Sequence, residues 1–300
     1  MCGIIAILSD KNVYDYIMYG LTQLQNRGYD STGLAYINGN SVMIYKYASN
    51  ESKLALEQLK SNTHYIRYNS NIHMIMAHTR WATHGGKNNI NSHPHISFDK
   101  KISIVHNGII TNYNEIKDFL FSKDIQPISE TDSELIAHVI AFHYEIEKNI
   151  KQAIDNTMSQ LKGSWALIIM CTDTPNTLYG IKYQTSLLLG YTNNESMCVF
   201  ASELSAFNDN IEHYIIPNDN EIITIYKKNN KVLFNCCNTT SYIYDNQNKE
   251  LLTPDPYTYW LEKEINDQYT CIKNIQDNIE NKYYQRLNSS NQQYDLRYLD

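Results

Sequence analysis

The chain has 300 residues, of which 42% are hydrophobic and 12% aromatic, and its formal net charge is −7. These values are typical of a globular protein with one large or two small domains, and the negative charge argues against a nucleic-acid partner. No apolar run approaches the roughly 18 residues of a membrane-spanning helix, and the N-terminus lacks the basic flank of a signal peptide. We therefore expect a cytoplasmic protein without membrane contact.

Strand-like runs outnumber helical ones, and no regular strand–helix–strand rhythm is present. Strands are predicted at 2–8, 32–37, 42–48, 73–82, 102–110, 164–172, 177–183, 186–191 and 196–202, with a hairpin over 221–235 that turns at Asn229-Asn230. Helices are predicted at 13–28, ending at Gly28, and at 131–146, where Thr131 or Asp132 precedes an amphipathic run. The pattern indicates antiparallel sheets stacked on each other, with helices outside them.

The character of the chain changes near residue 240. Residues 239–260 are polar, contain two prolines and are typical of a linker, whereas 261–287 are charged and helical in pattern. The last residues, 289–300, are typical of a frayed terminus. We expect one domain over 2–240, followed over 241–300 by a linker and the start of a further region.

Cys2 directly follows the initiator methionine and precedes an apolar strand. Methionine beside a small residue is usually removed, which would give Cys2 both a thiol and a free α-amine. Such an amine titrates near pH ~7.7–8, so it can act as the base for its own thiol nucleophile. The alternative is a small buried cysteine that starts a strand.

An arginine and a small, polar loop follow the predicted strand at 73–82. In AHTRWATHG, residues 77–85, Arg80 is followed by Trp81, Thr83 and His84. A guanidinium at this position could bind a carboxylate with two hydrogen bonds, and the loop could close over it. The alternative is an exposed arginine beside a tryptophan that anchors a turn.

Two further motifs carry polar groups at element ends. Asn107 and Gly108 leave a strand together, so a side-chain amide and a backbone N–H could form an oxyanion hole, although a plain Asn-Gly turn is the usual alternative. Asp132, in SETDSE, could receive an ammonium group, and the alternative role of a helix N-cap is compatible with that.

Several histidines cluster in the same part of the sequence, namely His78, His84, His93, His95 and His106. Imidazole is a common metal ligand, but neither an HExxH nor a CxxC pattern accompanies them. There is also no GxGxxG motif and no P-loop. We therefore expect neither a metal nor an organic cofactor, and the dispersed cysteines are interpreted as reduced thiols.

Six motifs together resemble one family. They are the CGI start, NRGYDSTGLA (26–35), HTRWATHG (78–85), N-x-HPH (91–95), HNGIITNY (106–113) and SETDSE (129–134). In this order and spacing they resemble the glutaminase domain, a class II glutamine amidotransferase, of glutamine–fructose-6-phosphate aminotransferases. The resemblance covers about residues 2–240. It implies an α+β fold, the four-layer αββα sandwich of N-terminal-nucleophile hydrolases.

The resemblance also implies roles for individual residues. Cys2 would be the nucleophile that hydrolyses the L-glutamine side chain, with Asn107 and Gly108 as the oxyanion hole. Arg80 would bind the α-carboxylate with help from Thr83 and His84, Asp132 would bind the α-amino group, Trp81 would belong to the closing loop, and Arg27 would lie near the nucleophile.

The chain departs from the family after residue 258. The segment 259–268 resembles the start of two sugar-isomerising domains, yet only 32 further residues follow it, up to Asp300. We therefore expect fructose 6-phosphate to be served only through isomerase domains absent from this chain, with a homodimer or a partner isomerase subunit as open alternatives. Two other interpretations remain at this stage, a glutaminase domain that serves another acceptor and a catalytically silent glutamine-binding regulator.

Overall fold

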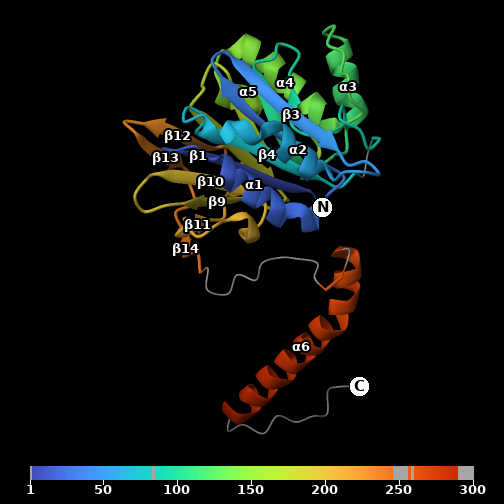
Figure 1. Cartoon of the computed structure of the whole chain (residues 1–300), viewed down its shortest axis with the longest axis vertical. Coiled ribbons are helices and arrows are strands. Elements are labelled where there is room, and N and C mark those ends of the chain that lie inside the picture. Colours follow the sequence, from blue (N-terminus) through green and yellow to red (C-terminus); the bar gives the residue numbers. More distant parts are fainter. Residues whose placement is uncertain (1, 83–84, 246–255, 258–259, 290–300) are drawn as a thin grey trace. The chain divides into compact units, whose positions relative to one another are not determined.

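The computed structural model describes residues 2–82, 85–245, 256–257 and 260–289. The chain divides into two compact units, Met1–Glu250 and Leu251–Asp300, which are described separately (Figure 1). None of the helices in the described ranges has the length and apolar character that crossing a membrane requires.

The N-terminal unit consists of strands in two sheets, with helices between groups of strands. Its strands are β1 (Gly3–Ser9), β2 (Ser31–Asn38), β3 (Ser41–Ala48), β4 (Met74–Arg80), β5 (His95–Ile96), β6 (Ile102–Ile110), β7 (Gly163–Cys171), β8 (Thr177–Tyr183), β9 (Leu188–Tyr191), β10 (Met197–Ala201), β11 (His213–Ile215), β12 (Ile223–Lys228), β13 (Lys231–Asn235) and β14 (Ser241–Ile243). Its α-helices are α1 (Tyr14–Gln23), α2 (Ala55–Thr63), α3 (Tyr113–Phe121), α4 (Asp132–Glu147) and α5 (Ile150–Met158), with short 3₁₀ turns that include η1 (Leu24–Arg27).

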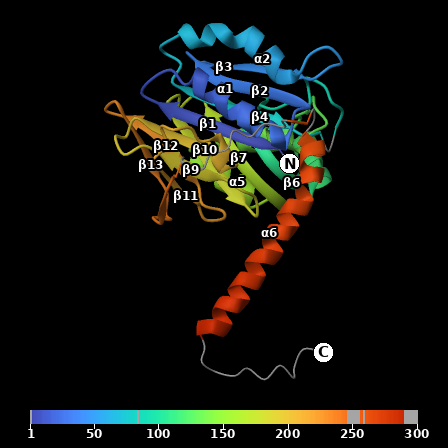
Figure 2. The same cartoon turned by 60° about the horizontal axis from the view of Figure 1, so that its bottom comes forward.

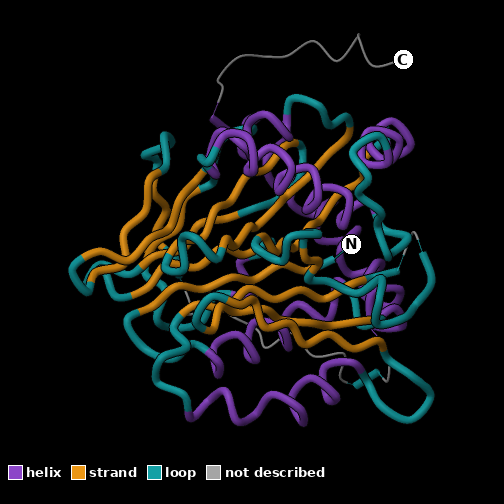
Figure 3. The backbone as a smooth tube through the Cα atoms, turned by 90° about the horizontal axis from the view of Figure 1, so that it is seen from above, coloured by secondary structure: helices purple, strands orange, loops and turns teal. Residues whose placement is uncertain are grey.

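These elements form four layers. An eight-stranded antiparallel sheet has the order β14-β11-β9-β10-β1-β4-β2-β3, and a six-stranded antiparallel sheet has the order β13-β12-β8-β7-β6-β5. Helices α1 and α2 pack on the outer face of the larger sheet (Figure 2), and α3, α4 and α5 pack on the outer face of the smaller one. Figure 3 shows helices on both outer sides of the stacked strands. The predicted α+β four-layer sandwich of antiparallel sheets is confirmed.

The central strands are apolar on both faces because both faces are covered. In β1, Ile4 contributes to the core between the two sheets, whereas Ile5 contributes to the core beneath α1. In β7, Ile168 faces the other sheet and Ile169 faces the helices. Successive side chains of a strand point to opposite faces, so a continuous apolar run suits a strand buried on both sides.

Several local predictions are confirmed. The strands expected between residues 2 and 202 and the helix 13–28 are present, although the last turn of that helix is the 3₁₀ turn η1. The hairpin turn occurs at Asn229 and Asn230, whose φ angles are 52° and 61°. Two left-handed residues in a two-residue loop match the twist of the flanking strands. In the second unit, the helical prediction is confirmed by α6 (Trp260–Ser289). The frayed terminus predicted over 289–300 begins with the last residue of α6, and the rest of it lies outside the described residues.

Three local predictions are wrong or incomplete. The linker expected over 239–260 contains β14, which pairs with β11. Helix α4 was predicted to be amphipathic, but its first half is not. Residues 133–141 are all buried, because α3, α5, β5 and β6 pack around this part of the helix. Elements α2, α3, α5, β5, β11 and β14 have no counterpart in the prediction. The domain boundary at residue 240 stays a prediction, and β14 follows directly after it.

Candidate active site

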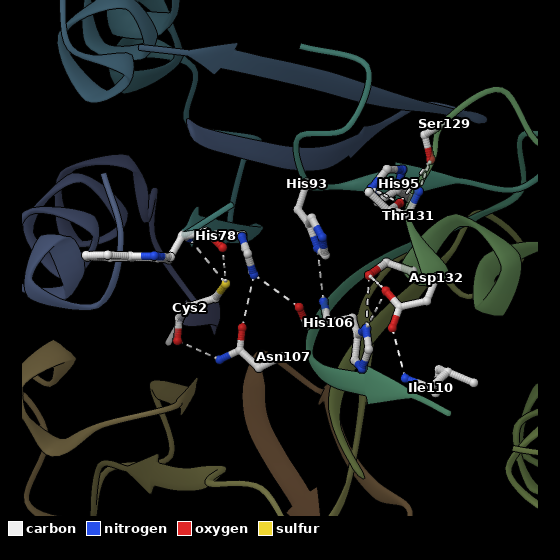
Figure 4. A network of polar contacts seen from close by, with 12 residues as sticks. Cys2, His78, His93, His95, His106, Asn107, Ile110, Ser129, Thr131 and Asp132 are labelled. Carbon is white, nitrogen blue, oxygen red and sulfur yellow. Dashed lines mark hydrogen bonds and ion pairs between the residues drawn. The ribbon is translucent and has the colours of Figure 1, made fainter. Parts of the chain in front are cut away.

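Cys2 lies at the point where β1 begins and its neighbour β4 ends. Antiparallel pairing places Gly3 opposite Thr79, so Cys2 lies beside the chain that leaves β4. The Trp81 N–H donates a hydrogen bond to Cys2 Sγ at 3.4 Å, and the thiol faces the Trp81 carbonyl oxygen at 3.7 Å (Figure 4). The register of two strands therefore sets the position of the sulfur atom.

Gly28 allows the chain after η1 to approach this site closely. A Cβ atom at Gly28 would lie 2.5 Å from the Arg80 carbonyl carbon and from the Trp81 nitrogen. Its φ of 165° is extended and open to any residue, so the glycine does not end the helix by a left-handed conformation. The glycine is needed because two backbone segments are in contact here.

The main chain of Cys2 is held by two side chains. Its carbonyl oxygen accepts hydrogen bonds from Arg27 Nε at 3.1 Å and from Asn107 Nδ2 at 2.8 Å. Arg27 is itself paired with Glu203, which follows β10. These bonds orient the peptide of Cys2 and thus the thiol that projects from it.

The thiol of Cys2 is in an environment that opposes ionisation. Burial raises the pKa of the Cys2 thiol, while the Trp81 N–H and the positive charges of Arg80 and Arg27 act in the opposite direction. The sulfur is consequently protonated near neutral pH. A base must take its proton before it can act as a nucleophile.

Asn107 and Gly108 belong to the interior of β6, paired with β7, so the alternative of a plain Asn-Gly turn is wrong. In a strand, alternate N–H groups point to the same edge. The His106 N–H donates to His93 and the Ile110 N–H donates to Asp132, so the Gly108 N–H between them points to this edge as well.

Gly108 itself requires a glycine. Its φ is 140°, and a Cβ atom there would lie 2.0 Å from the Ser164 carbonyl oxygen. A side chain at this position would push β6 away from β7, and the backbone donor would move with it.

Arg80 is the last residue of β4 and is only 5% exposed, so the alternative of an ordinary exposed arginine is wrong. Burial lowers the pKa of its guanidinium, while Cys2, Asp30, Asp132 and Glu130 raise it. An arginine buried among acidic groups keeps its charge and can present it to a ligand.

The loop after β4 is also tied to the fold. Trp81 is 39% exposed and contacts the Tyr29 ring edge-on at a centroid distance of 5.7 Å. Asp30 accepts a hydrogen bond from the Ala82 N–H at 3.0 Å and pairs with Lys87 at 3.2 Å. The predicted ligands Thr83 and His84 lie outside the described residues.

Asp132 is the first residue of α4, and Thr131 occupies the N-cap position without a side-chain capping bond. The Asp132 carboxylate accepts hydrogen bonds from the Ile110 N–H at 3.0 Å and from the Ser133 hydroxyl at 3.2 Å. The interpretation of Asp132 as an N-cap is therefore wrong. Its carboxylate is instead fixed against the end of β6, 3.8 Å from His106 Nδ1.

A small cavity brings these groups together. Its volume is about 50 Å³, and it is lined by Cys2, Arg80, Trp81, His93, His106, Gly108, Thr131, Asp132 and Ser133. A thiol, a guanidinium and a carboxylate thus face one space. Asn107 and Arg27 reach the same place through the carbonyl of Cys2.

Four buried histidines lie close together in this region, and two of them, His93 and His106, line the cavity, but the four do not form an evident metal centre. Among the residues that the structure describes, no three His, Cys, Asp or Glu side chains are grouped so that they could hold an ion. The rings of His78 and His93 stack at 4.1 Å, and His93 meets His95 edge-on at 4.8 Å. Burial lowers the pKa values of His78, His93, His95 and His106, so these rings are neutral at physiological pH.

Sequence reasoning missed two residues of this arrangement, Asp30 and Glu203, and it considered His78 only as a possible metal ligand. Asp30 lies within the NRGYDSTG motif, so its position among the motif residues is the signal that could have revealed it. Glu203 follows a strand far along the chain and carries no such signal.

Comparisons with known proteins agree with this fold. A family model described as a glutamine amidotransferase domain matches residues 78–209. The glutamine phosphoribosylpyrophosphate amidotransferase of B. subtilis superposes with a TM-score of 0.61 at 20% identity over 80% of this chain and 50% of its own. The structure titled as the allosteric regulatory enzyme of purine biosynthesis gives 0.64 at 21% identity, with the same coverage of both chains.

The fold and the family match identify the class: the chain contains a glutamine amidotransferase domain, matched over residues 78–209, and it shares its fold with these two solved structures. Curated relatives are glutamine–fructose-6-phosphate aminotransferases. That of Buchnera aphidicola is 36% identical over 284 residues, or 91% of this chain and 44% of its own length. That of Helicobacter pylori is 33% identical over 272 residues, or 91% and 43%. The chain spans a little under half the length of these relatives.

Proposed function

We propose that this domain hydrolyses the side-chain amide of L-glutamine to glutamate and ammonia, with Cys2 as the nucleophile once Met1 has been removed. The observation that carries the proposal is the convergence of the Cys2 thiol, the Arg80 guanidinium and the Asp132 carboxylate on one cavity. An α-amino acid presents a carboxylate and an ammonium group, and these are the groups that Arg80 and Asp132 match.

The chemistry follows from the same groups. The α-amine of Cys2 takes the thiol proton, directly or through a water, and Sγ attacks the side-chain carbonyl carbon of glutamine. The oxygen that becomes negative is stabilised by Asn107 and by the N–H of Gly108. The amine then returns the proton to the departing nitrogen, so ammonia leaves and a γ-glutamyl thioester remains. Water, activated by the same amine, cleaves the thioester to glutamate and restores the thiol.

The geometry supports separate roles for binding and chemistry. Arg80 and Asp132 are anchored by β4 and α4, whereas Asn107 and Gly108 belong to β6 on the opposite sheet. We propose that Arg80 binds the α-carboxylate with Thr83 and His84, that Asp132 binds the α-amino group, and that Trp81 covers the bound substrate. Arg27 orients the nucleophile through the Cys2 carbonyl.

We further propose that the ammonia serves the amination of fructose 6-phosphate, because the curated relatives carry that name. The isomerase site would then lie outside these 300 residues, on a partner subunit or elsewhere on a longer polypeptide. The proposed location is the cytoplasm, where a reduced thiol is maintained. The amide hydrolysis itself, as proposed, uses only protein groups and water.

The test is release of glutamate and ammonia from L-glutamine by the purified chain, after intact-mass analysis has established whether Met1 is present. Cys2→Ala should abolish turnover, and a diazoketone analogue of glutamine should add one covalent mass to Cys2. Cys271→Ala, on exposed α6, is the matched control and should behave as the wild type. Turnover that survives Cys2→Ala, or labelling at another cysteine, would overturn the proposal. Retention of Met1 with no turnover would favour a silent glutamine-binding domain.

A further inference from the structure

His78 is a buried residue of β4 whose ring points at the oxyanion residue Asn107. Its side chain is next to the active site but does not line the cavity. Its Nε2 lies 3.0 Å from Asn107 Oδ1 and 3.1 Å from the His106 carbonyl oxygen (Figure 4). Its Nδ1 is buried and has no hydrogen-bond partner in the described ranges.

The contacts of His78 determine where its proton is. A carbonyl oxygen can only accept, so the Nε2 that faces the His106 carbonyl must carry the hydrogen. The unpartnered Nδ1 is then the unprotonated nitrogen of a neutral ring. Burial lowers the pKa of His78 to about 3, with Arg80 and His106 acting in the same direction, so this tautomer persists at physiological pH.

The tautomer of His78 in turn determines the orientation of the Asn107 amide. Because Nε2–H is a donor, the amide must turn its oxygen toward His78 and its nitrogen toward Cys2. The opposite orientation would place an NH₂ group against an N–H and would bring two oxygens together at the Cys2 carbonyl. One hydrogen of Asn107 Nδ2 bonds the Cys2 carbonyl at 2.8 Å, and the second remains for an oxygen near Sγ.

The ring of His78 is also held in place by the ring of His93. His93 stacks on it with an interplanar angle of 12°, and His93 Nδ1 accepts the His106 N–H at 3.3 Å. His95 contacts His93 edge-on and bonds Thr131, at the start of α4, at 3.0 Å. His78 is therefore part of a packed, neutral stack, and rotation of its ring would break two hydrogen bonds.

We propose that His78 is a positioning residue for amide hydrolysis, whose Nε2–H holds the Asn107 amide with its nitrogen directed at the oxyanion. This inference rests on the proposed function. It differs from a packing role, because a phenylalanine could fill the same space and stack on His93 but could not orient the amide.

The experiment compares His78→Phe, which removes the donor, with His78→Gln, whose amide nitrogen can reach the position of Nε2. We expect His78→Phe to lower kcat for glutamine by up to roughly 10²–10³-fold, the effect of losing one oxyanion donor, with little change in KM. His78→Gln should recover most of that loss. In an Asn107→Ala background, His78→Phe should cost almost nothing further, because the group that it orients is gone.

A second buried histidine provides the control for packing. His138 of α4 is 3% exposed and accepts the Phe98 N–H, away from the cavity. His138→Phe should lower the free energy of unfolding without changing kcat. If His78→Phe lowered kcat equally in the wild-type and Asn107→Ala backgrounds, or raised only KM, the proposal would be overturned.

The ¹⁵N spectrum of the imidazoles separates this inference from the proposed function. His78 should show the neutral Nε2–H tautomer from pH 5 to pH 9, whether or not the chain turns glutamine over. A wild-type chain without glutaminase activity would refute the proposed function, whereas an Nδ1–H tautomer for His78 would refute the orientation of Asn107 in an active chain.

Discussion

Replacement of Asp132 by asparagine is expected to raise the KM for glutamine and to leave kcat nearly unchanged. The Asp132 carboxylate lines the cavity and accepts the Ile110 N–H at 3.0 Å. An amide oxygen can keep that bond, so the start of α4 and the end of β6 should stay in place. What is lost is the negative charge that we assign to the α-ammonium group of the substrate.

The magnitude follows from the environment of the carboxylate. A hydrogen bond to a charged group contributes about 1.5–3 kcal/mol, and the Asp132 side chain is 23% exposed, which reduces the value toward the lower half of that range. Each 1.36 kcal/mol is a factor of about ten, so KM should rise roughly 10- to 50-fold. The contact is the same in the ground and transition states, and kcat should therefore change by less than about threefold.

The assay compares glutamine with glutaramate, which keeps the carboxylate and the amide but lacks the α-amine. Asp132→Asn should lose its disadvantage on glutaramate, because that substrate has no ammonium group for the charge to bind. Arg80→Lys is the matched variant, and it should weaken binding of both substrates, since both keep the carboxylate. An equal loss on both substrates for Asp132→Asn, or a fall in kcat with KM unchanged, would refute the assignment.

Three further outcomes are expected. Because burial raises the pKa of the Cys2 thiol, its thiolate forms at higher pH than that of a cysteine in a model peptide. The rate of Cys2 alkylation by iodoacetamide should therefore still rise with pH where the rate for the peptide has levelled off. A Cys2 rate that levels off at lower pH than the peptide rate would contradict the burial argument. Gly28→Ala should lower the free energy of unfolding, measured by denaturant titration, by roughly 1–3 kcal/mol, because its Cβ would meet the backbone of Arg80 and Trp81. Gly39→Asn is the control and should leave the free energy of unfolding nearly unchanged, because Gly39 lies in a left-handed turn with open space around it. Fructose 6-phosphate should neither accelerate ammonia release from this chain nor be converted to glucosamine 6-phosphate. The measurement is a coupled ammonia assay with and without the sugar phosphate. A several-fold acceleration would show that the C-terminal region contributes a sugar-phosphate site.

Local sequence determined much of the architecture of this protein. The apolar runs at 2–8 and 164–172 predicted strands, and the Asn229-Asn230 pair predicted a hairpin, because each signal depends on neighbouring residues alone. The order of six short motifs indicated the class of protein. Cys2, Arg80 and Asp132 belong to three of those motifs, so their candidacy as site residues was visible before the fold was known.

Only the tertiary structure decided how these motifs meet. Nothing local distinguishes a strand Asn-Gly from a turn, and Gly108 lies in a strand because β7 pairs alongside it. Arg27 and Glu203 are 176 residues apart, and their pairing depends on the approach of η1 to the end of β10. The orientation of Asn107 depends on His78 from the opposite sheet. Contacts of this kind form when strands distant in the sequence pair within a sheet, or when the two sheets pack face to face, so no window of sequence contains the information that defines them.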